Sequence, residues 1–134
     1  MIEVEISKII IDETKKEQVI ILKAKPDSKL LPIVIGLNEA EAIRVQLSGF
    51  ISSRPLTHDL IKSLIDAFGF VLQKVIVDKL VDSTFHAKLY LEDTDGAVKI
   101  IDARPSDSIA LAVRTKSPIF VEEEVLERLS MGGL

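Results

Sequence analysis

Hydrophobic and polar residues alternate along much of this 134-residue chain, with helix-like spacing in between. At the amino terminus, isoleucine and valine occupy every second position, which predicts a strand with one buried face. The same pattern, or a short apolar run bounded by turn residues, predicts strands at six further places. The expected strands are 2–11, 18–25, 31–35, 70–80, 84–92, 97–102 and 118–121.

Four segments combine helical spacing with the residues that start and stop helices. Asn38 and Glu41 fit a capping box, and Gly49 is the expected stop. Thr57 and Ser106 each precede an acidic residue and an apolar run, so we expect their hydroxyls to cap helices. The expected helices are 38–48, 57–68, 106–115 and 122–129. The glycines that follow predict a frayed tail from about residue 130.

The order β-β-β-α-α-β-β-β-α-β-α predicts an α+β fold, with about four helices packed on a mixed, largely antiparallel sheet. The length is that of one domain, 1–134, long enough to bury roughly two thirds of its unfolded surface. Strands followed by a helix that Arg-Pro introduces occur in both halves, which hints at a duplication.

Composition narrows the class of protein. The chain is 47% hydrophobic and contains no cysteine, so a reducing cytoplasm is the expected location. No apolar stretch approaches the ~18 residues of a membrane span, and we expect no membrane association. The net charge of −4 argues against a general nucleic-acid coating protein, but it is compatible with an enzyme that has a local basic cleft.

Two short segments hold most of the candidate chemistry. The first runs from Arg54 to Asp59 and the second from Asp102 to Ser108, and each contains Arg-Pro. Proline pushes the residue before it toward extended geometry, so each arginine should leave the backbone just ahead of a helix. Arginines and hydroxyls beside free backbone N–H groups suit phosphate binding, and they suit plain helix capping too. The candidate phosphate-binding residues are Arg54, Arg104, Thr57 and Ser106.

Carboxylates and one histidine in these segments could support catalysis. Because His58 and His86 are the only histidines, a metal site would need oxygen ligands, which suits Mg²⁺ or Mn²⁺. The candidate ligands are Asp59, Asp102 and Asp107. The helix dipole should disfavour the charged form of His58, and a neutral histidine there could act as a general base. The alternative is that these aspartates serve helix starts and ion pairs and that His58 has no role.

Several motifs of this chain, taken in order, carry a family resemblance. They are LPIVIG at 31–36 with Glu39-Ala40 after it, RPLTHDL at 54–60, TFHA at 84–87 and DARPSDSIALA at 102–112. In this order they resemble the bifunctional nuclease family of bacteria, archaea and plants, over nearly the whole chain from Met1 to about Leu129. The resemblance implies a small α+β domain with DNase and RNase activity. The matching polar positions are Glu39, Arg54, Thr57, His58, Asp59, Asp102, Arg104, Ser106 and Asp107.

The first hypothesis is therefore a nuclease that hydrolyses phosphodiester bonds in DNA and RNA. Arg54 and Arg104 would hold phosphate oxygens, the three aspartates would hold a divalent ion, and His58 would position or deprotonate water. The rival is a non-enzymatic dimeric module that binds an anionic ligand or a protein partner with the same groups. A stress or regulatory protein that acts by association is a third class, and it shares the rival's lack of turnover.

A homodimer is expected in either case. The mean hydropathy of +0.29 is high for a chain of this size, and surplus apolar surface usually marks an interface. Two strand-rich halves also supply sheet edges that must be covered or paired. The alternative is a monomer whose hydropathy reflects isoleucine-rich strands.

Overall fold

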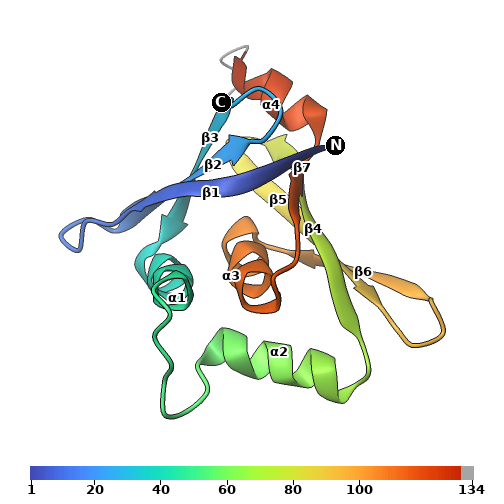
Figure 1. Cartoon of the computed structure of the whole chain (residues 1–134). Coiled ribbons are helices and arrows are strands. Elements are labelled where there is room, and N and C mark those ends of the chain that lie inside the picture. The colour runs from blue at the N-terminus through green and yellow to red at the C-terminus, as the bar shows by residue number, and fades with distance from the viewer. Residues whose placement is uncertain (131–134) are drawn as a thin grey trace.

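The computed structural model describes residues 1–130, and seven strands of this part form one mixed sheet (Figure 1). They are β1 (Ile2–Ile10), β2 (Glu17–Ala24), β3 (Leu30–Gly36), β4 (Val71–Val81), β5 (Thr84–Glu92), β6 (Val98–Ala103) and β7 (Ile119–Val121). The four helices described are α1 (Leu37–Leu47), α2 (Thr57–Ala67), α3 (Pro105–Thr115) and α4 (Glu123–Ser130). The predicted element order and the α+β class are confirmed. The expected frayed tail lies almost wholly outside the described residues.

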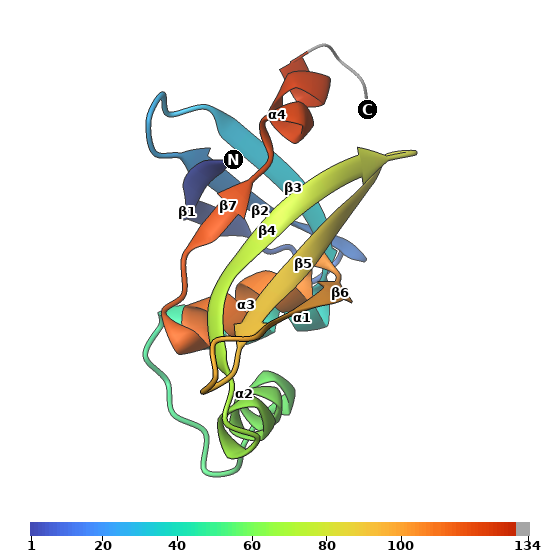
Figure 2. The same cartoon turned by 90° about the vertical axis from the view of Figure 1, so that its right-hand side faces the viewer.

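The strand order across the sheet is β3-β2-β1-β7-β4-β5-β6. Neighbouring strands are antiparallel except β4 and β7, which run parallel. The short β7 therefore joins two antiparallel three-stranded units, because it pairs with β1 on one side and with β4 on the other. The long, curved β4 and β5 are seen best in Figure 2.

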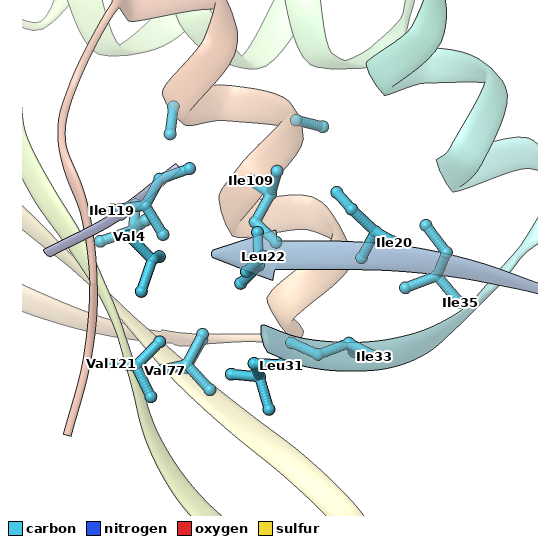
Figure 3. Close-up of a cluster of buried hydrophobic side chains, with 14 of the residues drawn as sticks. Val4, Ile20, Leu22, Leu31, Ile33, Ile35, Val77, Ile109, Ile119 and Val121 are labelled. Atoms are coloured by element: carbon cyan, nitrogen blue, oxygen red, sulfur yellow. The ribbon is translucent and has the colours of Figure 1, made fainter. Parts of the chain in front are cut away.

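The core lies between the curled sheet and α3. Alternate residues of β2 and β3 point inward, among them Ile20 and Leu31, and they meet Ile109 of α3 and Val77 of β4 (Figure 3). Each such aliphatic side chain contributes about 1.5–3 kcal/mol when it is fully buried. This packing places α3 at the centre of the molecule, where it contacts both α1 and α2.

The first helix does not have the expected capping box. Gly36, in an extended conformation, is its N-cap, and Leu37 is its first helical residue. Asn38 therefore lies inside the first turn, where it cannot cap the helix. Glu41 pairs with Arg44, three residues later, instead of reaching back to the helix start.

The expected hydroxyl caps of α2 and α3 are also wrong. The N-caps are Leu56 and Arg104, so Thr57 and Ser106 lie inside the first turns. Pro105 is the first helical residue of α3, a position that suits its fixed φ and its missing N–H. A proline at this position moves the helix start ahead of the serine, and this displaces the expected cap.

Within residues 1–130, no helix has both the length and the apolar character needed to cross a membrane. The expected cytoplasmic location stays a prediction.

Candidate active site at three helix starts

The starts of α1, α2 and α3 each carry an acidic side chain at the third helical residue. These residues are Glu39, Asp59 and Asp107, and His58 stands one position before Asp59. The first backbone N–H groups of a helix have no intrahelical acceptor, and the helix dipole favours negative charge there. The helix α3 contacts both α1 and α2, and the two Arg-Pro segments that sequence analysis singled out lie at the starts of α2 and α3.

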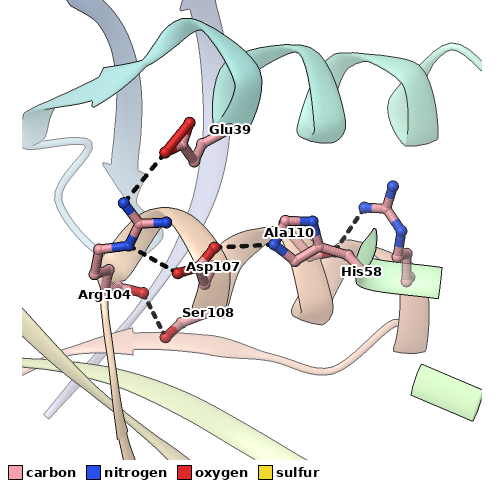
Figure 4. Close-up of polar contacts among 7 residues, drawn as sticks. Glu39, His58, Arg104, Asp107, Ser108 and Ala110 are labelled. Carbon is pink, nitrogen blue, oxygen red and sulfur yellow. Dashed lines mark hydrogen bonds and ion pairs between the residues drawn. The ribbon is translucent and has the colours of Figure 1, made fainter. Parts of the chain in front are cut away.

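A chain of polar contacts links the three helices (Figure 4). The Nε of Arg104 donates to Oδ2 of Asp107 at 2.9 Å, and its NH1 lies 3.2 Å from Oε1 of Glu39. The other oxygen of Asp107, Oδ1, lies 3.0 Å from Nε2 of His58. The hydroxyl of Ser108 donates to the carbonyl of Arg104 at 2.9 Å, which fixes the backbone from which the arginine extends. Asp107 is thus shared between an arginine and a histidine.

The polar contacts around Asp107 favour the ionised form of its carboxyl group. Burial alone would raise the pKa of its carboxyl group, but hydrogen bonds from Arg104 and His58 outweigh that penalty and lower the pKa below the usual aspartate value. The hydrogen bond to Asp107 raises the pKa of Arg104 in turn. With Asp107 ionised, Nε2 of His58 is the hydrogen-bond donor. The carboxylate therefore fixes the orientation of the imidazole.

A second ion pair joins α2 and α3, separate from the contacts of Asp107 with Arg104 and His58. The Nε of Arg114 donates to Oδ1 of Asp59 at 2.7 Å, and its NH1 donates to the carbonyl of Ala110 at 3.0 Å. The Arg114 side chain is only 2% exposed. The Leu56 N–H, 2.9 Å from Oδ2 of Asp59, is the main cause of a lowered pKa for that carboxyl, and Arg114 adds to it. Asp59 therefore caps α2 and neutralises a buried arginine.

Two of the expected site residues stand apart from the cluster. Asp102 lies on β6 with its side chain 76% exposed, and it accepts a hydrogen bond from Lys88 at 3.1 Å. Arg54 is exposed and makes no hydrogen bond or ion pair within residues 1–130. Arg104 lines the two hollows described below and Arg54 lines neither, so the two arginines do not share a lining.

The proposed metal ligands do not gather either. Asp59, Asp102 and Asp107 are paired with three different cations, namely Arg114, Lys88 and Arg104. Nowhere in the described part of the chain do three or more histidine or acidic side chains converge as metal ligands would. The three aspartates thus do not fit a shared Mg²⁺ or Mn²⁺ site.

A cleft of about 690 Å³ lies beside the polar chain, between α1, α2 and the start of α3. Thr57, His58, Arg104 and Asp107 line it together with Glu39, which sequence analysis matched to the family motifs but did not place in the site. His58 is only 7% exposed, and its Nδ1 has no hydrogen-bond partner among residues 1–130. The cleft thus combines an oriented imidazole with an arginine, an arrangement suited to proton transfer at a bound anion.

Ser106 is separated from the other expected phosphate-binding residues of the cleft. It is buried in the first turn of α3 and lines a groove on the other side of Arg104. Arg104 itself lines both the cleft and this groove.

Comparison with known proteins shows which protein family this sequence is similar to. Residues 20–132, which include all of the polar chain, match the model of the bifunctional nuclease domain. An uncharacterized protein of Mycobacterium tuberculosis is 40% identical over 129 residues, or 96% of this chain and 76% of that protein. Bifunctional nuclease 1 of Arabidopsis thaliana is 31% identical over 70% of this chain, and bifunctional nuclease 2 of Oryza sativa subsp. japonica is 29% identical over 86%. These matches span only 30% and 36% of the two plant proteins. The chain belongs to the bifunctional nuclease domain family.

Proposed function

We propose that this chain hydrolyses phosphodiester bonds in DNA and RNA and that the cleft lined by His58, Arg104 and Asp107 is its active site. The observation that carries the proposal is the 3.0 Å contact between Nε2 of His58 and Oδ1 of Asp107, with Arg104 on the other oxygen of the same carboxylate. The family match and the names of the plant relatives support a nucleic-acid substrate.

His58 acts as the general base in this proposal. Asp107 accepts the Nε2–H, which leaves Nδ1 to take a proton from water. The water oxygen then attacks phosphorus, the bond from phosphorus to the leaving oxygen breaks, and solvent protonates that oxygen. The imidazolium formed is stabilised by the Asp107 carboxylate, in the way that an aspartate supports histidine in serine proteases.

Arg104 binds the phosphate. A guanidinium has five N–H donors, and the contacts to Asp107 and Glu39 occupy Nε and one position on NH1. The remaining donors can hold phosphate oxygens through charge-assisted hydrogen bonds. Glu39 and Asp107 limit the rotamers of this exposed side chain, so less entropy is lost when the substrate binds.

No step is assigned to a metal ion, because the carboxylates proposed as its ligands lie apart. Dependence on Mg²⁺ or Mn²⁺ stays a prediction, and the activity assay tests it by comparing each metal with EDTA.

The direct test is His58→Ala, assayed on plasmid DNA and on single-stranded RNA. We expect a loss of about 100-fold or more in rate, because a positioned general base contributes about 10²–10⁴-fold. His86→Ala is the matched control, since His86, on β5, lines neither the cleft nor the groove. Equal rates for His58→Ala and wild type would contradict the proposal. Wild-type protein without turnover under every metal condition would favour the non-enzymatic module that binds an anion.

We also infer that the chain forms a homodimer. Large apolar side chains are exposed on α2 and on the segments on either side of it, and an apolar surface of this kind favours association. They are Phe50, Ile51, Leu60, Leu64 and Phe68. Light scattering after size exclusion should give twice the 14.8 kDa of one chain, and a mass that stays at 14.8 kDa on concentration would contradict the inference.

A further inference from the structure

A groove of about 680 Å³ lies on the far side of Arg104 from the cleft. One wall is β3, the opposite wall is the start of β5, and the first residues of α3 lie between them. In the sheet order β3 is one edge and β5 is next to the other edge, β6, so the groove exists because the sheet curls. Its volume is within the range of pockets that hold a nucleotide-sized ligand.

The floor of the groove has an unused hydrogen-bonding group. Ser106 is 5% exposed, it lines the groove, and its hydroxyl has no hydrogen-bond partner within residues 1–130. Among the described residues the one fully buried side-chain nitrogen or oxygen atom without a hydrogen bond is Oδ1 of Asp78, so the unpaired Ser106 hydroxyl is open to the groove and is free to bind a ligand there. Ser106 also lies in the first turn of α3, where free N–H groups and the helix dipole favour an anion.

The net charge of the lining side chains is positive in the groove and negative in the cleft. Arg104 and Lys16 line the groove against a single carboxylate of its lining, Glu17. The cleft is lined by Arg104 against the carboxylates of Glu39, Glu41 and Asp107. A phosphate chain therefore gains more from the groove than from the cleft before reaction. The contacts of Arg104 with Glu39 and Asp107 leave further N–H donors unused, and this arginine lines the groove.

The walls of the groove are apolar. Pro32 and Val34, which are exposed on β3, and Val19 of β2 line the groove together with the half-buried Phe85 of β5. Nucleobases stack on such surfaces only when they are unpaired, because a duplex buries its base faces. Pro32 also removes one N–H from the edge strand, which disfavours the addition of a peptide strand there.

We propose that this groove binds a single-stranded segment of DNA or RNA, with one phosphate on Arg104 and Ser106 and a base on Phe85. This inference rests on the proposed nuclease function, and it names the substrate class as single-stranded. Arg104 and His58 contact the two oxygens of one carboxylate, so a phosphate held from the groove side is delivered next to the catalytic histidine. The groove binds the strand, and the cleft supplies the base for hydrolysis.

The test is binding to the full chain carrying His58→Ala, which removes the proposed base and leaves the groove intact. Fluorescence anisotropy with labelled single strands of about twelve nucleotides, DNA and RNA, is compared with a duplex of the same length. We expect single strands to bind about tenfold tighter than the duplex. Phe85→Leu keeps the apolar packing but removes the ring, and it should weaken single-strand binding about fivefold or more.

Two further variants test the phosphate contacts in the same background. Ser106→Asp places a negative charge against the phosphate and should weaken binding about tenfold, although acidic residues suit the first turn of a helix. Arg104→Gln should reduce the slope of log affinity against log salt by about 0.7, the value for one phosphate contact on a single strand. Lys62→Gln is the matched control on α2, since Lys62 pairs with Asp66 outside the groove.

Each result supports the proposal or overturns it. A duplex that binds as tightly as a single strand overturns it, and so does unchanged affinity of a folded Ser106→Asp variant. If thermal unfolding shows that Ser106→Asp does not fold, the salt slope of Arg104→Gln and the affinity of Phe85→Leu decide. Wild-type turnover without single-strand binding by the His58→Ala protein overturns the groove alone. Selective single-strand binding without any wild-type turnover overturns the nuclease function and supports the groove.

Discussion

The two Arg-Pro segments contain nearly the same residue types, yet they form different structures. In the second segment Arg104 is the N-cap of α3, and the acidic Asp107 follows it by three residues. In the first segment α2 starts two residues later relative to its Arg-Pro, so Asp59 follows Arg54 by five residues. Both aspartates are nevertheless the third residue of their helix. The position in the helix is the same, so the distance from the Arg-Pro pair decides whether the preceding arginine reaches the carboxylate.

The two aspartates also differ in what they contact across the helix pair. Asp107 of α3 contacts His58 of α2 at the cleft, whereas Asp59 of α2 contacts the buried Arg114 of α3. The same position in two helices thus supports chemistry in one case and packing in the other. Substitutions at matched positions should separate these two roles.

The largest effect is expected for Asp107→Asn. The amide keeps the shape of the side chain but loses the charge that orients and stabilises His58, so kcat should fall about 10²–10⁴-fold. Asp59→Asn should change kcat less than about threefold, since Asp59 does not contact the histidine ring or the cleft arginine. Steady-state kinetics on single-stranded RNA measures both variants. Equal losses would show that the two helix starts do not divide these roles.

Next in size is the pair Arg104→Gln and Arg54→Gln. Loss of a charge-assisted contact to phosphate should reduce kcat/KM about 10- to 100-fold for the first variant. Arg54→Gln should change kcat/KM less than about twofold, because Arg54 is exposed and lines neither hollow. The comparison fails if the two variants lose activity equally, which would return Arg54 to the site.

A smaller effect, on stability, is expected for Asp59→Ala. The substitution leaves the buried Arg114 without its carboxylate, and the free energy of unfolding should fall by about 1–2 kcal/mol. The loss is smaller than for a fully buried pair because solvent reaches the Asp59 side chain. Urea denaturation measures the change, with Asp102→Ala on the exposed strand as the control, for which we expect less than about 0.5 kcal/mol.

The smallest effect concerns the stability of the fold at acidic pH. The pKa values of Asp59 and Asp107 are both lowered in the folded chain, so each stabilises the fold above the ordinary aspartate pKa of about 3.9. That stability is lost as the pH falls through the lowered values. Thermal unfolding of wild type below about pH 4 should therefore shift to lower temperature. Asp59→Asn should flatten this dependence, and a slope equal to that of wild type would show that the Asp59 charge does not stabilise the fold.

Local patterns predicted the elements well. The alternation from Gln18 to Ala24 marks a strand on its own, and the Asp95-Gly96 turn, with positive φ at the glycine, forms as expected. Helix starts were less predictable, because Pro55 precedes its helix whereas Pro105 begins one. Which of these occurs depends on how α2 and α3 pack, and the short motif does not contain that information.

The partners within the site could not be read from the chain. His58 and Asp107 are 49 positions apart, and Asp59 and Arg114 are 55 apart, so only the packing of α2 on α3 pairs them. One signal was available for Arg114, because it is a lone charge after the apolar run IALAV of α3. A charge in such a run needs a partner when it is buried, and that requirement points to a carboxylate on a neighbouring helix.

The three-residue β7 has a consequence for the order of events in folding. It is the only described strand that connects the two antiparallel units, and it comes from residues 119–121, near the end of the described chain. During synthesis, the earlier strands can pair locally, but the two units cannot share one sheet until this segment leaves the ribosome. Since β3 and β5 belong to different units, a ribosome-bound chain stopped before residue 119 should lack the groove, although it already contains every residue that lines it.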